Sequence, residues 1–247
     1  MNHPVLYAII MFVAVVAAYL LSRNRQSSLG LSPRQRRAIG LGAFIGAMLG
    51  AKLPFVIASG EGIFSRVWLD NGKTILFGLV GGYFGVEIAK WLNGIRVKTG
   101  DSFAVPIAVA VGIGRLSCLA AGCCFGVPTS LPWGVDFGDG IARHPTQVYE
   151  TLFHLSCAIL LEFLIRRRMF SGQLIKLYIL LYLAFRFVTE FLRPEPVIAL
   201  GLTFYQWSAL LIAPIFIYLW WRDAVMFAAS SNGSLANGDR SMITTET

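Results

Sequence analysis

Residues 103–121 read FAVPIAVAVGIGRLSCLAA, a long apolar run whose one charged residue is Arg115. At ~1.5 Å of rise per residue, a helix of this length comes close to crossing ~30 Å of hydrocarbon. Similar runs occur at residues 4–22, 38–58, 74–93, 150–165, 172–192 and 203–221. The sequence therefore predicts an all-α, polytopic membrane protein with seven transmembrane helices.

The composition supports this class. Of the 247 residues, 56% are hydrophobic and 14% are charged, whereas soluble domains carry about 25% charged residues. We predict one membrane domain over residues 1–226, followed by a polar, disordered cytoplasmic tail over residues 227–247. No cationic leader precedes the first apolar run, so we interpret this run as a retained helix rather than a cleaved signal peptide.

The loop cations are unevenly distributed between the two sides that seven spans define. One side carries Arg23, Arg25, Arg34, Arg36, Arg37, Lys90, Arg96, Lys98, Arg166, Arg167 and Arg168. The other side carries Arg66, Lys73, Arg143 and Arg193. The positive-inside rule then places the N-terminus outside and the C-terminus in the cytoplasm. The basic loops are accounted for by topology and anionic headgroups, and we expect no nucleic-acid partner.

Small residues recur at four-residue spacing in the second and third runs. The residues are Gly42, Gly46 and Gly50 in the second run, and Gly78 with Gly82 and Gly81 with Gly85 in the third. Such spacing lets two helices approach closely in lipid. We interpret these glycines as packing residues.

Polar residues from four predicted helices fall at one depth. Arg115 precedes Gly122 by seven residues, and Arg186 precedes Arg193 by seven, which places both ~10 Å inside the outer ends of their helices. Lys52 and Tyr7 lie at similar depth on the second and first helices, as counted along the sequence. This convergence predicts a site toward the outer leaflet, since charges inside a bilayer demand a partner or a purpose.

Arg186 and Glu190 are spaced i, i+4, and Arg193 follows. Glu190 can neutralise one arginine, which leaves a positive charge on Arg115, Arg186 and Lys52. An excess of arginine suits an anionic headgroup, because a guanidinium binds phosphate in a bidentate manner. The alternative is an ion-pair network that only holds the helices together.

Three cysteines, Cys118, Cys123 and Cys124, fall at the outer end of the fourth run, and Cys157 lies apart in the fifth. An oxidising outer compartment permits a disulfide among them. Free thiols, a catalytic thiol and a metal site remain open alternatives, and His144 is the nearest candidate for a fourth metal ligand.

Several segments together resemble the prolipoprotein diacylglyceryl transferase family. The matching segments are GRL at 114–116 with Gly122 and Gly126, LPWGV at 131–135, RHPTQVYE at 143–150 and FRFVTEFLR at 185–193. Tyr7 falls where the family has an N-terminal tyrosine. The segment GAMLGAK at 46–52 is similar to the family's GxxxGAR, with Lys52 in place of arginine. Seven spans with the N-terminus outside is also the topology of the family.

The resemblance implies an activity. Members of the family transfer the diacylglyceryl group of phosphatidylglycerol to the lipobox cysteine of a preprolipoprotein signal peptide, and glycerol 1-phosphate is released. It implies a multi-pass protein of the bacterial cytoplasmic (inner) membrane with its site toward the outer leaflet, and no metal or organic cofactor. The implied catalytic residues are Arg115, Arg186, Glu190, His144 and Tyr7. The implied substrate-binding residues are Arg115, Arg186, Lys52, Gly126, Arg143, Cys118 and Cys123.

The sequence departs from the family pattern at three positions. Cys118 stands where the family commonly has asparagine, Cys123 where it has glutamate, and Val80 where it has a histidine before a Gly-Gly pair. These changes keep two rivals open: a non-catalytic phosphatidylglycerol-binding paralogue and a membrane thiol oxidoreductase. A solute transporter is disfavoured because the candidate residues gather at one face.

Overall fold

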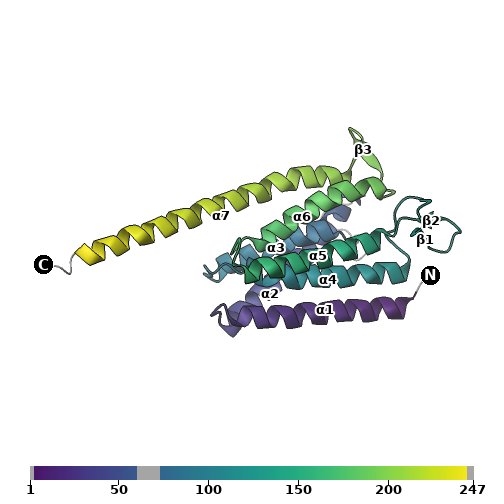
Figure 1. The fold of residues 1–247 in the computed structure, drawn as a ribbon. Helices are drawn as coiled ribbons and strands as arrows, with labels where there is room; N and C mark the ends of the chain where they lie inside the picture. Colours follow the sequence, from purple (N-terminus) through teal and green to yellow (C-terminus); the bar gives the residue numbers. More distant parts are fainter. Residues whose placement is uncertain (1–2, 60–72, 244–247) are drawn as a thin grey trace.

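The computed structural model describes residues 3–59 and 73–243, with the backbone alone for residues 227–243. This part of the chain contains seven α-helices (Figure 1). They are α1 (Pro4–Ser27), α2 (Pro33–Ser59), α3 (Ile75–Leu92), α4 (Gly100–Ala121), α5 (Thr146–Arg166), α6 (Leu174–Thr189) and α7 (Phe204–Ile243). The prediction of a mainly helical chain is confirmed. The loop cation Arg66 lies outside the described residues.

Six of the described helices, all except α6, are long and apolar enough to cross a membrane. The helix α6 has 16 residues, fewer than the ~20 that a span requires. The predicted run 172–192 is therefore interrupted, because α6 ends at Thr189 and a 3-10 turn, η2 (Glu190–Leu192), follows. A multi-pass membrane protein is supported, while the count of seven spans and their orientation stay predictions.

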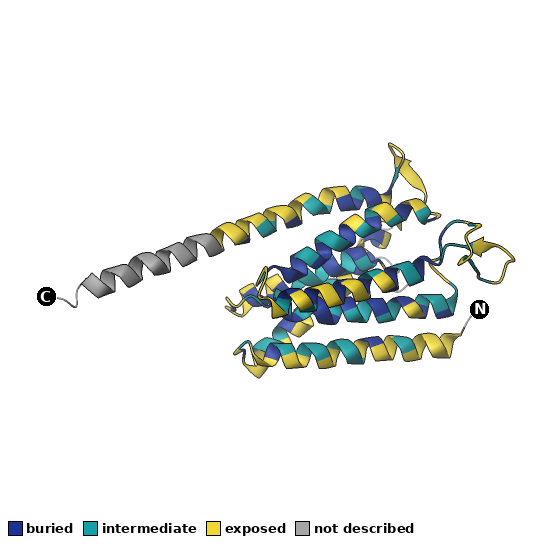
Figure 2. Cartoon of the chain, viewed as in Figure 1, coloured by how far each residue is buried: buried dark blue, intermediate teal, exposed yellow. Residues whose placement is uncertain are grey.

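Exposed residues lie along the outside of the bundle (Figure 2), and many of them are large and apolar. Phe12 is 70% exposed, Leu41 60% and Ile159 73%. A soluble monomer rarely shows apolar surface on this scale. In lipid it carries no penalty, so this belt is the surface expected to face acyl chains.

The interior is formed by α3 to α7. Leu161, Tyr178, Ile179 and Phe216 are fully buried there, and Val80 packs at the edge of this cluster. The helix α1 lies outside this core and packs against α4. As a result α4 contacts α1 on one side and α5 and α6 on the other.

The close approach of α2 to α3 depends on the predicted glycines. A β-carbon added at Gly46 would lie 2.2 Å from the carbonyl oxygen of Gly81 and 2.9 Å from the α-carbon of Gly85. Added at Gly81, it would lie 2.3 Å from the carbonyl oxygen of Gly46. The two backbones are in direct contact, so only glycine fits at these positions.

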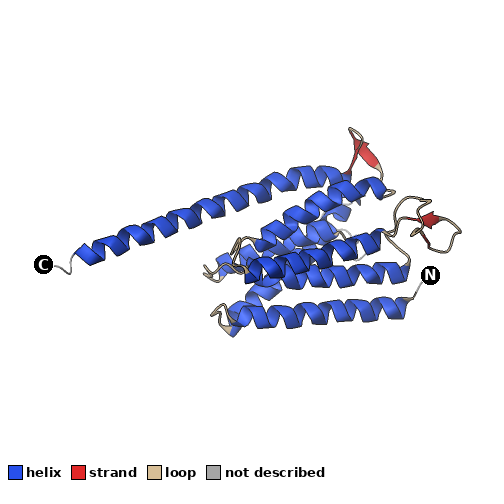
Figure 3. Ribbon diagram, viewed as in Figure 1, coloured by secondary structure: helices blue, strands red, loops and turns tan. Residues whose placement is uncertain are grey.

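Two short antiparallel hairpins lie at the end of the bundle where the N-terminus is found (Figures 1 and 3). The first pairs β1 (Val135–Asp136) with β2 (Ala142–Arg143), and the second pairs β3 (Val197–Ala199) with β4 (Leu202–Thr203). Both hairpins interrupt the connections between helices at this end. They lie at the same end of the bundle as the polar residues described below.

The last helix, α7, continues along the backbone to Ile243, past residue 226, where we placed the end of the membrane domain. The side chains of residues 227–243 and the whole of residues 244–247 lie outside the described part. The disorder predicted for residues 227–247 stays a prediction.

We expect the substitution Gly46→Ala to lower the free energy of unfolding by about 1–3 kcal/mol, as overpacking does elsewhere. The added methyl would force α2 away from α3. The control is Gly40→Ala in the same helix, where an added β-carbon meets nothing within 4 Å. Unfolding by denaturing detergent measures both variants, and equal stabilities would contradict the contact.

Candidate functional site

Three buried guanidinium groups converge on one carboxylate at the end of the bundle that carries the hairpins. The Glu150 Oε1 atom pairs with Nη2 of Arg115 and with Nη2 of Arg193, and it lies 3.6 Å from Nη1 of Arg186. Each of these four residues is less than a tenth exposed. With Glu190, they are called the arginine cluster below.

The second carboxylate of the arginine cluster holds Arg186 from the other side. The Nη2 atom of Arg186 lies 2.7 Å from Oε2 of Glu190. The Thr203 hydroxyl donates to Oε1 of Glu190 at 2.9 Å. The Arg186 guanidinium also lies over the Tyr205 ring, 4.4 Å from its centroid, a cation–π geometry. Arg186 is therefore held by contacts from α5, η2 and α7, and β4 supports its partner Glu190.

The turn after α6 brings Arg193 back to the cluster. The sequence analysis placed Arg186, Glu190 and Arg193 along one helix. In the structure the helix ends at Thr189, and the Arg193 amide donates to the Glu190 carbonyl at 3.0 Å across the 3-10 turn. Arg193 reaches Glu150 on α5 from this turn.

Glu150 is the main residue that the sequence analysis overlooked, since it assigned only Glu190 as a counter-ion. The cluster has three positive and two negative side chains, a formal excess of one positive charge. Yet the Nε atoms of Arg115 and Arg193 are buried without a hydrogen-bond partner among the described residues. The signal for Glu150 was its position as an acid in the first turn of the fifth apolar run.

A buried histidine was also missed. His154 lies one turn after Glu150 on α5 and is fully buried. Its Nδ1 atom lies 2.8 Å from the Tyr178 hydroxyl, and within the described part Nε2 has no partner. The Tyr182 hydroxyl donates to Oε2 of Glu150 at 3.4 Å. These side chains extend the polar site inward from the arginine cluster.

The sulfur atoms of Cys118, Cys123 and Cys124 lie within 4.8 Å of one another, and this group is called the thiol cluster. All are free thiols, as is Cys157, which is buried apart in the core. The Arg115 Nη1 atom lies 3.8 Å from the Cys118 sulfur, so the thiol cluster adjoins the arginine cluster. The Tyr7 phenol on α1 is close enough to interact electrostatically with all three thiols.

The charge state of Cys124 reflects this neighbourhood. Hydrogen bonding from Cys118, together with the positive charges of Arg115 and Arg193, lowers the pKa of the Cys124 thiol to about 5, although burial opposes the shift. This neighbourhood favours the thiolate form at Cys124, and thiolate is the form that binds metals and reacts.

The loop between α4 and α5 carries Cys123 and Cys124 and holds two further predicted residues, Gly126 and His144. The Gly126 amide donates to the His144 carbonyl at 2.8 Å, and a β-carbon on Gly126 would lie 2.5 Å from the Leu192 carbonyl oxygen. The His144 Nδ1 atom lies 3.2 Å from the Tyr149 hydroxyl. His144 does not belong to the group of possible metal ligands formed by the described residues.

Arg143 has its contacts outside the arginine cluster. Arg143 pairs with Asp139 at 2.6 Å and lies over the Phe125 ring, 4.9 Å from its centroid, so both of these contacts lie within the loop. Lys52 is buried on α2. The roles predicted for both residues stay predictions.

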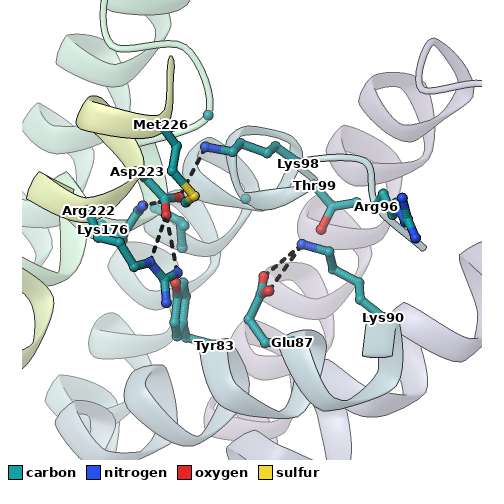
Figure 4. A pocket seen from close by; sticks show the side chains of 13 residues that line it. Tyr83, Glu87, Lys90, Arg96, Lys98, Thr99, Lys176, Arg222, Asp223 and Met226 are labelled. Atoms are coloured by element: carbon teal, nitrogen blue, oxygen red, sulfur yellow. Dashed lines mark hydrogen bonds and ion pairs between the residues drawn. The ribbon is translucent and has the colours of Figure 1, made fainter. Parts of the chain in front are cut away.

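A second charged region lies at the opposite end of the bundle, around a cavity of about 190 Å³. Figure 4 shows Glu87 facing Lys90, and Asp223 facing Lys98, Lys176 and Arg222. The closest of these pairs are Glu87–Lys90 at 2.9 Å and Asp223–Lys176 at 2.8 Å. The Asp223 pairs join α7 to α6 and to the connection between α3 and α4, whereas Glu87 and Lys90 pair within α3.

Comparison with known proteins decides the family. The model of the prolipoprotein diacylglyceryl transferase family matches residues 4–222. The chain belongs to this family. The match includes α1 to α6, the first part of α7 and the residues of both clusters.

Individual relatives carry the same description. The phosphatidylglycerol–prolipoprotein diacylglyceryl transferase of Clostridium tetani is 32% identical over 201 residues, which cover 77% of this chain and 81% of the relative. That of Geobacter sulfurreducens is 30% identical over 227 residues, 85% and 86% of the two chains. A Clostridium perfringens enzyme, diacylglyceryl transferase 2, is 27% identical over 208 residues, 79% and 81%.

We expect the substitution Glu150→Gln to destabilise the protein by about 3–5 kcal/mol, since it leaves buried guanidiniums without their shared carboxylate. Tyr182→Phe is the matched control, because it removes one hydrogen bond to Glu150 and no charge, at a cost of about 0.5–1.5 kcal/mol. Unfolding in detergent measures both. If the two variants were equally stable, Glu150 would not organise the cluster.

Proposed function

We propose that this protein transfers the diacylglyceryl group of phosphatidylglycerol to the lipobox cysteine of a prolipoprotein and releases glycerol 1-phosphate. The names of its relatives state this activity for those proteins. The observation in this chain that carries the proposal is the arginine cluster, with its excess positive charge and two buried Nε donors that have no partner within the described part of the chain. Buried donors without a partner call for a ligand, and phosphate oxygens are suited to guanidinium groups.

The chemistry requires cations at this place. Attack by a thiolate on the glyceryl carbon breaks the bond between that carbon and a phosphate oxygen, and negative charge grows on the phosphate. Arg115 and Arg186 bind that phosphate, and Glu190 orients Arg186 through the 2.7 Å pair. Donors held in place before the reaction stabilise developing charge most effectively. Glu150 keeps the three guanidiniums together before the lipid arrives.

The remaining predicted residues have roles around this centre. Lys52 and Arg143 add positive potential along the path of the headgroup, and Tyr7 lies at the thiol cluster. Gly126 allows the loop to close against Leu192. His144 is a candidate proton acceptor for the incoming thiol, positioned by Tyr149.

The proposal includes the orientation of the protein. Seven spans with the N-terminus outside would put the arginine cluster in the outer leaflet of the bacterial inner membrane, and the Glu87–Lys90 and Asp223 pairs at the cytoplasmic face. The excess of loop cations on the cytoplasmic side supports this topology. Phosphatidylglycerol would then enter laterally from the outer leaflet, and the prolipoprotein signal peptide would present its thiol below the loop at residues 122–149.

We expect Arg115→Ala to lower diacylglyceryl addition by at least ~10²–10³-fold, as the loss of one oriented charge donor does in other enzymes. Arg115→Lys should fail too, because an ammonium group cannot bind phosphate in a bidentate manner. The assay uses purified protein, phosphatidylglycerol and a synthetic lipobox peptide, with the mass of the peptide as readout.

The control for this experiment is Arg166→Ala, at the other end of α5, where the side chain is 77% exposed. It should retain full activity. Undiminished transfer by the Arg115→Ala variant would exclude the phosphate-binding role. Phosphatidylglycerol binding without any transfer by the unmodified protein would identify it as a non-catalytic lipid-binding member of the family.

A further inference from the structure

The thiol cluster has no role in the transfer as described so far, although it directly adjoins Arg115. We propose that Cys118, Cys123 and Cys124 hold a zinc ion whose fourth position is filled by the cysteine thiol of the prolipoprotein substrate. This inference rests on the proposed function. It departs from the expectation, drawn from the family resemblance, that no metal takes part.

The spacing of the sulfur atoms fits such a site. Zinc–sulfur bonds of ~2.3 Å at tetrahedral angles separate two sulfurs by ~3.8 Å. The three sulfurs already lie within 4.8 Å of one another, so an ion would draw them together by roughly 1 Å or less. Rotation of the Cys123 and Cys124 side chains, which are both exposed, can supply that movement.

The backbone explains how residues so close in the sequence share one site. The helix α4 carries Cys118 in its last turn and ends at Gly122, which has a φ of +66°. Cys124 has a φ of +62°, a left-handed conformation that is uncommon for residues other than glycine. These two turns fold the chain back, and they bring two successive cysteines to the sulfur of Cys118.

The ligand set is that of a catalytic zinc site rather than a structural one. Structural zinc sites have four protein ligands, whereas catalytic sites have three and an open position. Among the described residues, no histidine, further cysteine or acidic side chain joins the three thiols as a fourth ligand. His144, the fourth ligand considered from the sequence, contacts Tyr149 instead.

The position beside Arg115 shows what the open site would bind. The Cys118 sulfur lies 3.8 Å from the Arg115 guanidinium, which is the proposed phosphate ligand. A nucleophile bound at the zinc would therefore lie next to the leaving phosphate, with the glyceryl carbon between them. Zinc binds thiols as thiolates, because a coordinating thiol loses its proton. The thiol cluster would thus activate the substrate thiol as a thiolate. The family's histidine cannot do so in this chain, because Val80 stands in its place.

The reaction balances as follows. The substrate thiol releases its proton, to water or to the candidate acceptor His144, as its sulfur binds zinc. The sulfur lone pair forms the carbon–sulfur bond, and the carbon–oxygen bond to phosphate breaks. Its electron pair leaves with glycerol 1-phosphate. The product is a neutral thioether, a weaker ligand than thiolate, so it dissociates and reopens the fourth position.

The test measures the metal and the transfer separately. Elemental analysis of the purified full-length protein should give one zinc per chain. The triple variant Cys118→Ser, Cys123→Ser, Cys124→Ser should lose it, while Cys157→Ala, a cysteine outside the cluster, should keep it. After replacement by Co²⁺, the protein should show thiolate-to-cobalt charge-transfer bands. A lipobox peptide should intensify them, and the same peptide with serine in place of cysteine should not.

Removal of zinc by a chelator should slow diacylglyceryl addition by about 10²-fold, the lower range for loss of proton-transfer catalysis, and added zinc should restore it. Full transfer by zinc-free protein would overturn the metal proposal and leave the transferase intact. Zinc bound at the three cysteines, with peptide-dependent cobalt bands but no transfer, would uphold the site and refute the proposed function. The proposal would also be overturned by a disulfide within the thiol cluster, or by Co²⁺ bands that do not change when the peptide is added.

Discussion

The carboxylate of Glu150 is the point on which the polar end of this bundle depends. Three guanidiniums from α4, α6 and the turn after α6 cannot share a buried site without it, because like charges at close range repel strongly where water is excluded. One oxygen of Glu150 meets all three. Since α5 carries Glu150, its first turn must start at a fixed height beside α4, and the loop before it must be long enough to reach that point. The hydrogen bonds of Gly126 and Val127 to His144 and Leu192 fix this loop against η2.

The balance of charge in this cluster gives it two uses. Two carboxylates offset most of the buried positive charge, and the proposed phosphate would meet the one remaining charge and the Nε donors of Arg115 and Arg193, which have no partner among the described residues. A site with three arginines and no acid would be costly to bury, and one with full neutralisation would have little affinity for phosphate. The packing of the other helices keeps the charged side chains of the arginine cluster in place. The glycine contact of α2 with α3 removes freedom on one side of the bundle, and the interior formed by α3 to α7 sets the heights of α4, α5 and α6.

Much of this architecture could be predicted from the sequence, because hydrophobic length is a local property. Each helix follows an apolar run, and the glycine spacing identified the α2–α3 contact. The arginines were found because a charge in an apolar run is conspicuous. Glu150 was harder to recognise, since an acid near the start of a helix is common at surfaces, and only the fold shows that three arginines surround it. His154 was missed for a similar reason: a lone histidine in an apolar run gives no sign of its neighbours. The end of α6 at Thr189 was also unpredictable, because the 3-10 turn there is held by long-range contacts to Glu190.

The thiol and arginine clusters are complementary parts of one chemical problem. Transfer of an alkyl group from phosphate to sulfur needs a stabilised leaving group and an activated nucleophile, and the two must lie a few ångströms apart. Arg115 connects the two clusters, because its guanidinium pairs with Glu150 and also lies beside the Cys118 sulfur. A polar side chain in place of Cys118 or Cys123 could help only to stabilise the leaving group. Three thiols at the same place can serve the second, since they can hold an ion that converts an incoming thiol to thiolate. The departures of this chain from its family pattern are therefore consistent with a different way of activating the same nucleophile.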